Sequence, residues 1–101
     1  MGPETVYCDF QVDKQAVLLP GSATPHFPVV HFLGIHGSVL VEFIVDAVGR
    51  VEPQSVRVMS TSNVRLNQPV LDVVSSMRFK PAELHGQRVK ELLEMPFAFP
   101  P

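Results

Sequence analysis

The stretch Gly37-Ser38-Val39-Leu40-Val41-Glu42-Phe43-Ile44-Val45-Asp46 decides the fold. It is rich in β-branched and aromatic residues and contains no proline and no internal glycine, which is typical of a β-strand. Because successive side chains of a strand point to opposite faces, Val39, Val41, Phe43 and Val45 share one side, and that side is wholly apolar. The other side is mixed. The stretch therefore predicts a strand in a sheet that is covered on one face only.

A turn and a return strand follow this stretch. The turn, 46–50, combines an Asp that can bond to its own backbone with a Gly that tolerates a positive φ. The return begins at 50–52, is interrupted at Pro53 and resumes over 55–60. Because proline has no N–H to donate, the second strand is expected to be bulged or to lie at an edge near Pro53. These residues predict an antiparallel hairpin.

Beyond the hairpin the sequence predicts a helix and then a third long strand. From 66 to 79 the apolar residues recur three or four apart, as on one face of a helix; they are Leu66, Val70, Val73, Val74 and Met77. Asn67 is the expected N-cap, Pro69 lies in the first turn and Pro81 stops the helix. After a turn at His85-Gly86, residues 87–99 alternate between one apolar and one mixed face, which predicts the third strand.

The N-terminal part is expected to add a short strand over 5–12 at a sheet edge, with Cys8 buried on its apolar side. A loop rich in proline follows, and 29–34 is a candidate short helix after Pro28. The fold class is therefore α+β. We expect an antiparallel β-sheet of three main strands, joined by the N-terminal strand where it pairs, with one or two helices packed on one face.

Composition narrows the possible functions. The chain has 101 residues, enough for one domain, and a net charge of -2 with scattered basic residues, which argues against nucleic acid as a ligand. The spacing of His26, His31 and His36 fits neither helix-face nor alternate-strand metal ligands, so we expect no metal and no cofactor. No nucleophile elbow, phosphate loop or framed carboxylate pair is present, so an enzyme is not expected.

Several separated motifs, in order and at nearly matching spacing, resemble the C-terminal domain of TonB, the periplasmic energy transducer of Gram-negative envelopes. These motifs are Phe27-Pro28, the strand 37–46, Gly49-Arg50-Val51, Ser60-Thr61-Ser62-Asn63, Leu66-Asn67, Arg78-Phe79-Lys80-Pro81-Ala82, Gly86-Gln87-Arg88-Val89 and Pro96-Phe97-Ala98-Phe99. The resemblance covers roughly 25–99 and implies two parts, an N-terminal strand and loop (1–24) and a TonB-like C-terminal domain (25–101).

The resemblance also implies a function. Domains of this kind capture an extended peptide, the TonB box of an outer-membrane transporter, by adding it as a strand to a sheet edge and then transmit force for uptake. It implies a periplasmic location, with anchoring to the inner membrane and contact with inner-membrane motor proteins if the full-length protein carries an N-terminal transmembrane helix. Residues 1–101 contain no apolar run of the ~20 residues that such an anchor needs.

The last strand is the candidate receiving edge, because it is long and has no later element to cover it. The candidate partner-binding residues are Arg88, Val89, Lys90, Glu91, Leu92, Leu93, Glu94 and Met95, joined by analogy with the family by Phe27 and Pro28. Two alternatives stay open at this point. The N-terminal strand 5–12 caps the edge, or the edge pairs with a second copy in a homodimer or an envelope scaffold without a transport role.

Overall fold

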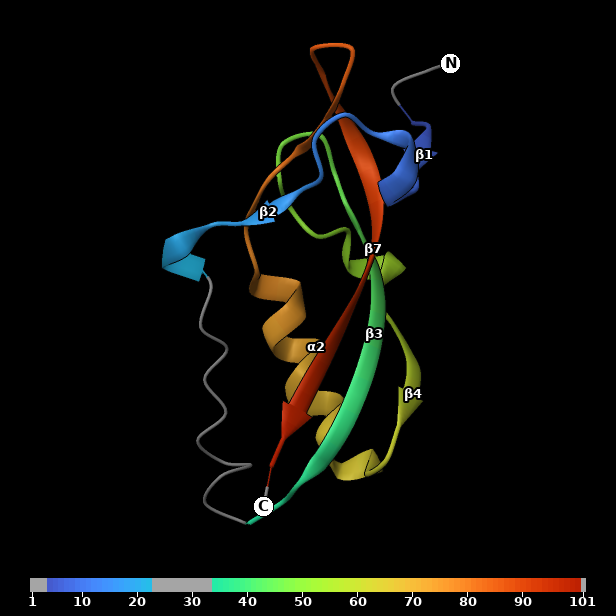
Figure 1. Cartoon of the computed structure of the whole chain (residues 1–101). Helices are drawn as coiled ribbons and strands as arrows, with labels where there is room; N and C mark the ends of the chain where they lie inside the picture. The colour runs from blue at the N-terminus through green and yellow to red at the C-terminus, as the bar shows by residue number, and fades with distance from the viewer. Residues whose placement is uncertain (1–3, 23–33, 101) are drawn as a thin grey trace.

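The computed structural model describes residues 4–22 and 34–100. The strands are β1 (Val6–Tyr7), β2 (Val17–Leu18), β3 (Gly37–Val45), β4 (Arg57–Thr61), β5 (Phe79–Lys80), β6 (Ala82–Leu84) and β7 (Gln87–Phe99), and the helix within these ranges is α2 (Asn67–Ser76). Short 3-10 turns cover Asp9–Gln11, Pro20–Ser22, Pro53–Ser55 and Val64–Leu66. The main sheet has the order β1-β7-β3-β4, with β6 paired to β7, while β2 and β5 form a separate pair (Figure 1).

Strand β3 forms the centre of the core, as its sequence predicts. The side chains of Val39, Val41, Phe43 and Val45 are at most 1% exposed. They pack in one cluster with the buried residues of α2, which lies against the face formed by β3 and β7 (Figure 1). The opposite face of β3 is only partly buried. The prediction of one covered face is therefore confirmed.

The turn after β3 has the predicted chemistry. The Oδ1 atom of Asp46 accepts hydrogen bonds from the N–H groups of Val48 at 3.0 Å and Arg50 at 2.9 Å. Gly49 has a φ of +91°, and a Cβ atom there would collide with the carbonyl oxygen of Phe79. Glycine is thus required twice, for its backbone conformation and for the close approach of the chain.

Strand β4 pairs antiparallel with β3 and lies at the edge of the main sheet. Between the turn and β4 the chain forms the 3-10 turn Pro53–Ser55, and the pairing shifts register between Leu40 and Val41. A proline in the middle of a ladder would remove a hydrogen bond, so the chain leaves the sheet at Pro53 and returns after it. The predictions of an interruption at Pro53 and of an edge position are confirmed.

Helix α2 is entered differently from the prediction. The 3-10 turn Val64–Leu66 runs directly into the helix, and the Oδ1 atom of Asn63 accepts from the N–H of Arg65 at 3.0 Å. The prediction of Asn67 as the N-cap is wrong, because the chain already has helical dihedrals at Leu66 and Asn67 is the first residue of α2. The capping function falls to Asn63 because the first turn is of the 3-10 type. The predicted core face is confirmed, since Leu66, Val70, Val74 and Met77 are buried and Val73 is half-buried.

The C-terminal strand has the predicted bounds, Gln87–Phe99. The turn before it places His85 and Gly86 at positive φ values of 53° and 77°. Residues 91–99 of β7 then run antiparallel to the whole length of β3, from Val45 opposite Glu91 to Gly37 opposite Phe99. The two longest strands therefore lie side by side in the middle of the sheet (Figure 1).

The N-terminal strand is shorter than expected, and it directs Tyr7, instead of the residues that alternate with it, toward the core. A strand was predicted over 5–12, but β1 covers only Val6–Tyr7. Its end has a local cause, because Gln11 accepts the N–H of Cys8 with its side chain at 2.8 Å and donates its own N–H to the Cys8 carbonyl at 3.0 Å. This 3-10 turn satisfies groups that a strand would leave to a neighbour. The expected buried thiol is also wrong, since Cys8 is half-buried.

The parallel pairing of β1 with β7 explains which N-terminal residue is buried. Tyr7 lies beside Glu91 on the core face, whereas Val6 lies beside Lys90 on the other face. Tyr7 is accordingly buried, whereas Phe10, which strict alternation over 5–12 would put on the same side as Cys8, is 81% exposed. The pairing makes the sheet mixed rather than purely antiparallel. The α+β class with a helix on one face is confirmed, and the helix expected over 29–34 lies, apart from Gly34, outside the described residues.

Candidate functional site

The last strand, β7, has different neighbours along its length. Over Ala82–Leu84, β6 pairs with its first residues, 87–89. β1 then pairs with Lys90 and Glu91, on the side away from β3. From Leu92 onward, β3 is the strand that pairs with β7 among residues 4–22 and 34–100. The side of β7 opposite β3 is therefore without a described strand beyond Glu91.

Hydrogen bonds of β3 show which backbone groups of β7 point to that side. Ser38 donates its N–H to Ser62 Oγ at 2.8 Å and accepts from the Ser62 N–H at 2.9 Å, so both of its backbone groups point away from β7. Ile44 likewise donates to Ser55 Oγ and accepts from the Glu52 N–H. In an antiparallel pair, such residues face partners whose N–H and C=O also point outward.

The partners opposite Ser38 and Ile44 are Ala98 and Leu92. Because the β3–β7 register is continuous between them, the same orientation holds for Glu94 and Pro96. We call the outward-pointing backbone groups of Leu92, Glu94, Pro96 and Ala98 the outer edge of β7. Pro96 has no N–H, and its position means that the β3–β7 ladder loses no hydrogen bond. Proline is tolerated in this long central strand because the backbone nitrogen of Pro96 faces away from β3.

The predicted partner-binding residues divide into three groups. Arg88 and Val89 are paired with β6, and Lys90 and Glu91 are paired with β1. The range 92–95, which holds Leu92, Leu93, Glu94 and Met95, is paired with β3 only, within the described part of the chain. Phe27 and Pro28 lie outside the described residues. The structure therefore brings only the second half of the predicted stretch to a part of β7 where no described strand pairs on the side opposite β3.

The side chain of Lys90 is held by two carboxylates. Its Nζ atom lies 2.6 Å from an oxygen of Glu52 and 2.9 Å from an oxygen of Glu4. These hydrogen bonds, the one to Glu52 first, raise the pKa of Lys90 above its usual value. Lys90 thus links the N-terminal segment to the chain just before β4.

The side chain of Glu91 lies in the core and is 0% exposed. Its Oε1 atom accepts the N–H of Ala16 at 2.7 Å, and its Oε2 atom is buried without a hydrogen-bond partner among the described residues. Burial raises the pKa of Glu91; the Ala16 N–H opposes this effect and the nearby charge of Asp9 adds to it. The sequence offered one signal for this group, a carboxylate at an apolar position of an alternating strand.

One cavity lies at the point where the N-terminal segment leaves β7. It has a volume of about 500 Å³ and is lined by residues 8–10 of the N-terminal segment, 92–94 of β7, and Gln15 and Glu42. It therefore lies where the outer edge begins. Three of the lining side chains are carboxylates, those of Asp9, Glu42 and Glu94, and none of the described lining residues is Lys, Arg or His.

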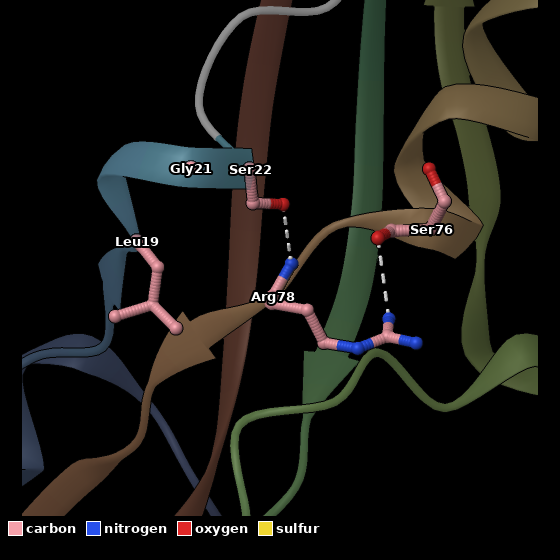
Figure 2. A pocket seen from close by; sticks show the side chains of 5 residues that line it. All are labelled: Leu19, Gly21, Ser22, Ser76 and Arg78. Atoms are coloured by element: carbon pink, nitrogen blue, oxygen red, sulfur yellow. Dashed lines mark hydrogen bonds between the residues drawn. The ribbon is translucent and has the colours of Figure 1, made fainter.

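A second cavity, of about 590 Å³, lies between the turn Pro20–Ser22 and the end of α2 (Figure 2). Arg78 directs its Nη1 atom to the carbonyl oxygens of Ser76 at 3.2 Å and Met77 at 3.0 Å, and Ser22 Oγ accepts the Arg78 N–H. A cation at the C-terminal end of a helix satisfies carbonyl groups that have no partner in the helix. The position of Arg78 in this cavity is therefore explained by its capping of the C-terminal end of α2.

Two other kinds of site are absent from the described residues. No group of three or more His, Cys, Asp or Glu in that part of the chain is placed to hold a metal ion, and His26 and His31 lie outside it. No helix there is long and apolar enough to cross a membrane.

The fold and the edge together define a class, an α+β domain whose last strand has outward-pointing backbone groups without a described strand partner from Glu94 onward. A family model described as "Gram-negative bacterial TonB protein C-terminal" matches residues 27–101. The chain therefore belongs to the TonB C-terminal domain family, a non-enzymatic family of energy-transducing domains of the cell envelope. Domains of this family are typically periplasmic and generally bind the TonB boxes of outer-membrane transporters.

A solved structure with the same fold is the solution NMR structure of the Pseudomonas aeruginosa TonB CTD. The two chains are 24% identical, the TM-score is 0.66, and the likeness covers 88% of this chain and 89% of that chain. A comparison with curated proteins found no match.

Proposed function

We propose that this chain is the periplasmic domain of a TonB-type energy transducer and that it captures the TonB box of an outer-membrane transporter on the outer edge of β7. Family membership supports the first part. The observation that carries the second part is the outward orientation of the backbone groups of Glu94 and Ala98, together with the Pro96 carbonyl, on a part of β7 where no described strand pairs on that side. Backbone groups of this kind are what an added strand pairs with.

Strand addition also suits the transmission of force. A peptide paired lengthwise with β7 distributes a pull along the strand over several backbone hydrogen bonds at the same time. β7 is itself paired with β3 over nine consecutive residue pairs, from Glu91 to Phe99. The load would therefore pass from the peptide into the longest ladder of the sheet. Contact with inner-membrane motor proteins through an N-terminal anchor, and contacts of Phe27 and Pro28 with the peptide, belong to the same proposal.

The test is amide hydrogen exchange, measured by NMR with and without a synthetic peptide that carries a TonB box. Strand addition should protect the amides of Glu94 and Ala98, whose N–H groups point outward, and should leave the protection of Leu93 and Met95 nearly unchanged because those amides already pair with β3. The control is the same peptide with N-methyl groups on alternate backbone nitrogens. Because it lacks the N–H donors on one edge of its strand, it should not protect Glu94 and Ala98. Equal protection of odd and even residues, or no change along 92–98, would contradict the proposal.

A second copy of the chain is the other candidate occupant of the same edge. Two outer edges can pair around a two-fold axis, which would give a homodimer or an envelope scaffold. Light scattering over a range of protein concentrations separates the two functions. A monomer whose outer-edge amides exchange fast supports peptide capture, whereas a dimer in which Glu94 and Ala98 are already protected supports self-association.

A further inference from the structure

The outer face of the sheet contains a like-charge pair. Glu42 of β3 lies directly opposite Glu94 of β7, and the pair is of the non-hydrogen-bonded type, in which side chains approach most closely. Like charges directly opposite each other destabilise an antiparallel pair. Arg57 Nη2 lies 3.1 Å from Glu42 Oε1 and so compensates one of the two charges. Glu94 has no ion pair or hydrogen bond from its side chain within residues 4–22 and 34–100.

The cavity at the start of the outer edge adds apolar surface to this charge. Phe10 is 81% exposed and lines the cavity together with Asp9, Leu92 and Glu94. An exposed aromatic ring beside two carboxylates suits the side chain of lysine or arginine, whose stem is apolar and whose head is cationic. Acidic or purely apolar side chains would leave one half of this surface unmatched.

Two nearby cations of the described part of the chain, Lys90 and Arg57, are already paired with other carboxylates. Lys90, two residues before Leu92 on the same face of β7, is held by Glu52 and Glu4. Arg57 is held by Glu42. Within residues 4–22 and 34–100, the lining of the cavity includes three carboxylates and no basic residue. A cationic ligand would therefore supply the charge complementarity that Lys90, Arg57 and the described lining of the cavity do not.

We propose that the strand bound on the outer edge of β7 places a lysine or arginine side chain in this cavity, next to Glu94. The proposal rests on the proposed function and names the chemistry of its peptide. In an added strand, the residue beside Glu94 shares the face of Glu94, and its neighbours two positions away share the faces of Leu92 and Pro96. The preferred peptide thus has a basic residue flanked, at every second position, by apolar or small residues.

Direct binding measurements with designed peptides test this proposal. The probe is an acetylated and amidated octapeptide, Thr-Val-Thr-Val-Lys-Val-Thr-Val, together with peptides in which the lysine is moved along the threonine face or replaced by glutamine or glutamate. For the best lysine position we expect about 5-fold tighter binding than for glutamine, as for an exposed ion pair assisted by an aromatic ring. The advantage should shrink at 0.5 M salt because the charges are screened.

Protein variants assign the effect to the cavity. The lysine preference should fall to about 1-fold in Glu94→Gln and in the double variant Asp9→Asn, Glu94→Gln. Asp72→Asn is the matched control, because it removes the same charge from α2, where Asp72 accepts a hydrogen bond from Gln68 that an asparagine oxygen can also accept. This control should keep the full preference. Thermal melting of each variant confirms that it folds.

The outcomes separate this proposal from the proposed function. Equal binding of the lysine, glutamine and glutamate peptides, with protection at Glu94 and Ala98, overturns the basic subsite and leaves strand addition in place. A lysine preference that survives in the double variant also overturns it. If none of the peptides binds, a TonB-box peptide that still protects Glu94 and Ala98 keeps the proposed function and rejects the subsite, whereas a tight dimer that excludes every peptide rejects both.

Discussion

Raising the pH should destabilise this domain through one group, the buried carboxyl of Glu91. Burial raises the pKa of Glu91 in the folded state, so the folded protein keeps a proton that the unfolded chain loses. The stabilising contribution is complete below the pKa of the unfolded chain and declines as the pH rises through the pKa of the folded state. This direction is opposite to that of an ion-paired carboxylate, which loses its contribution as the pH falls.

The size of the effect follows from the proton count. One proton bound by the folded state and absent from the unfolded state changes the free energy of unfolding by at most about 1.4 kcal/mol per pH unit. For a domain of this length, 1 kcal/mol corresponds to a shift of roughly 4–8 °C in Tm. The Ala16 N–H at 2.7 Å favours the charged form and sets a limit on the shift, while the nearby Asp9 acts in the other direction.

The assay is urea denaturation at a series of pH values for the wild type and for Glu91→Gln. The glutamine oxygen can still accept the Ala16 N–H, but its NH2 group is buried without a described partner, which costs about 1–3 kcal/mol at every pH. The informative quantity is therefore the slope of the difference between the two proteins. It should be negative for wild type minus variant from about pH 4.5, the ordinary pKa of a Glu carboxyl, up to the raised pKa of the folded state. A difference that is flat with pH, or that rises with it, would refute the reasoning.

Three further changes have expected outcomes. Gly49→Ala should cost more than about 2 kcal/mol in urea denaturation, because the new Cβ meets the Phe79 carbonyl at a φ of +91°; a loss under about 0.5 kcal/mol would contradict the described turn. Ser55→Ala should cost about 1–2 kcal/mol in the same measurement, because the Ile44 N–H loses its acceptor at 2.9 Å; Ser55→Thr, which keeps an oxygen, should cost less. Pro96→Ala adds an N–H to the outer edge, so calorimetry should show about 2- to 10-fold tighter peptide binding with an unchanged β3–β7 ladder. Weaker binding would place the peptide elsewhere.

The parts of the fold that the sequence predicts correctly are those determined by neighbours in the chain. The alternation in 37–45 and 87–99 indicates both the strands and the side that is buried, because these strands lie next to each other over one helix. Asp46 likewise specifies its turn through hydrogen bonds to backbone groups two and four residues later. In each case the local pattern and the tertiary environment favour the same conformation.

The parts that the sequence does not predict depend on distant contacts. β2 and β5 are two residues each, and they form only because residues 17–18 meet 79–80. The burial of Tyr7 rather than of Cys8 follows from a register with Glu91, more than eighty residues away. For the candidate site, the sequence indicates the strand. Which residues of that strand point their backbone groups away from β3, namely Leu92, Glu94 and Ala98, depends on the side to which β3 directs its own hydrogen bonds.

The end of β1 determines how much of the outer edge is available. β1 pairs in register with β7, Val6 beside Lys90 and Tyr7 beside Glu91. If the strand had continued to Val12, as its alternation predicts, the same register would have placed Val12 beside Pro96 and covered the outer edge. The 3-10 turn Asp9–Gln11, closed by the two hydrogen bonds between Cys8 and Gln11, directs the chain away at Tyr7. This short turn thus leaves the outer edge without a paired N-terminal strand and, in the same place, positions Asp9 and Phe10 at the cavity where an added strand would begin.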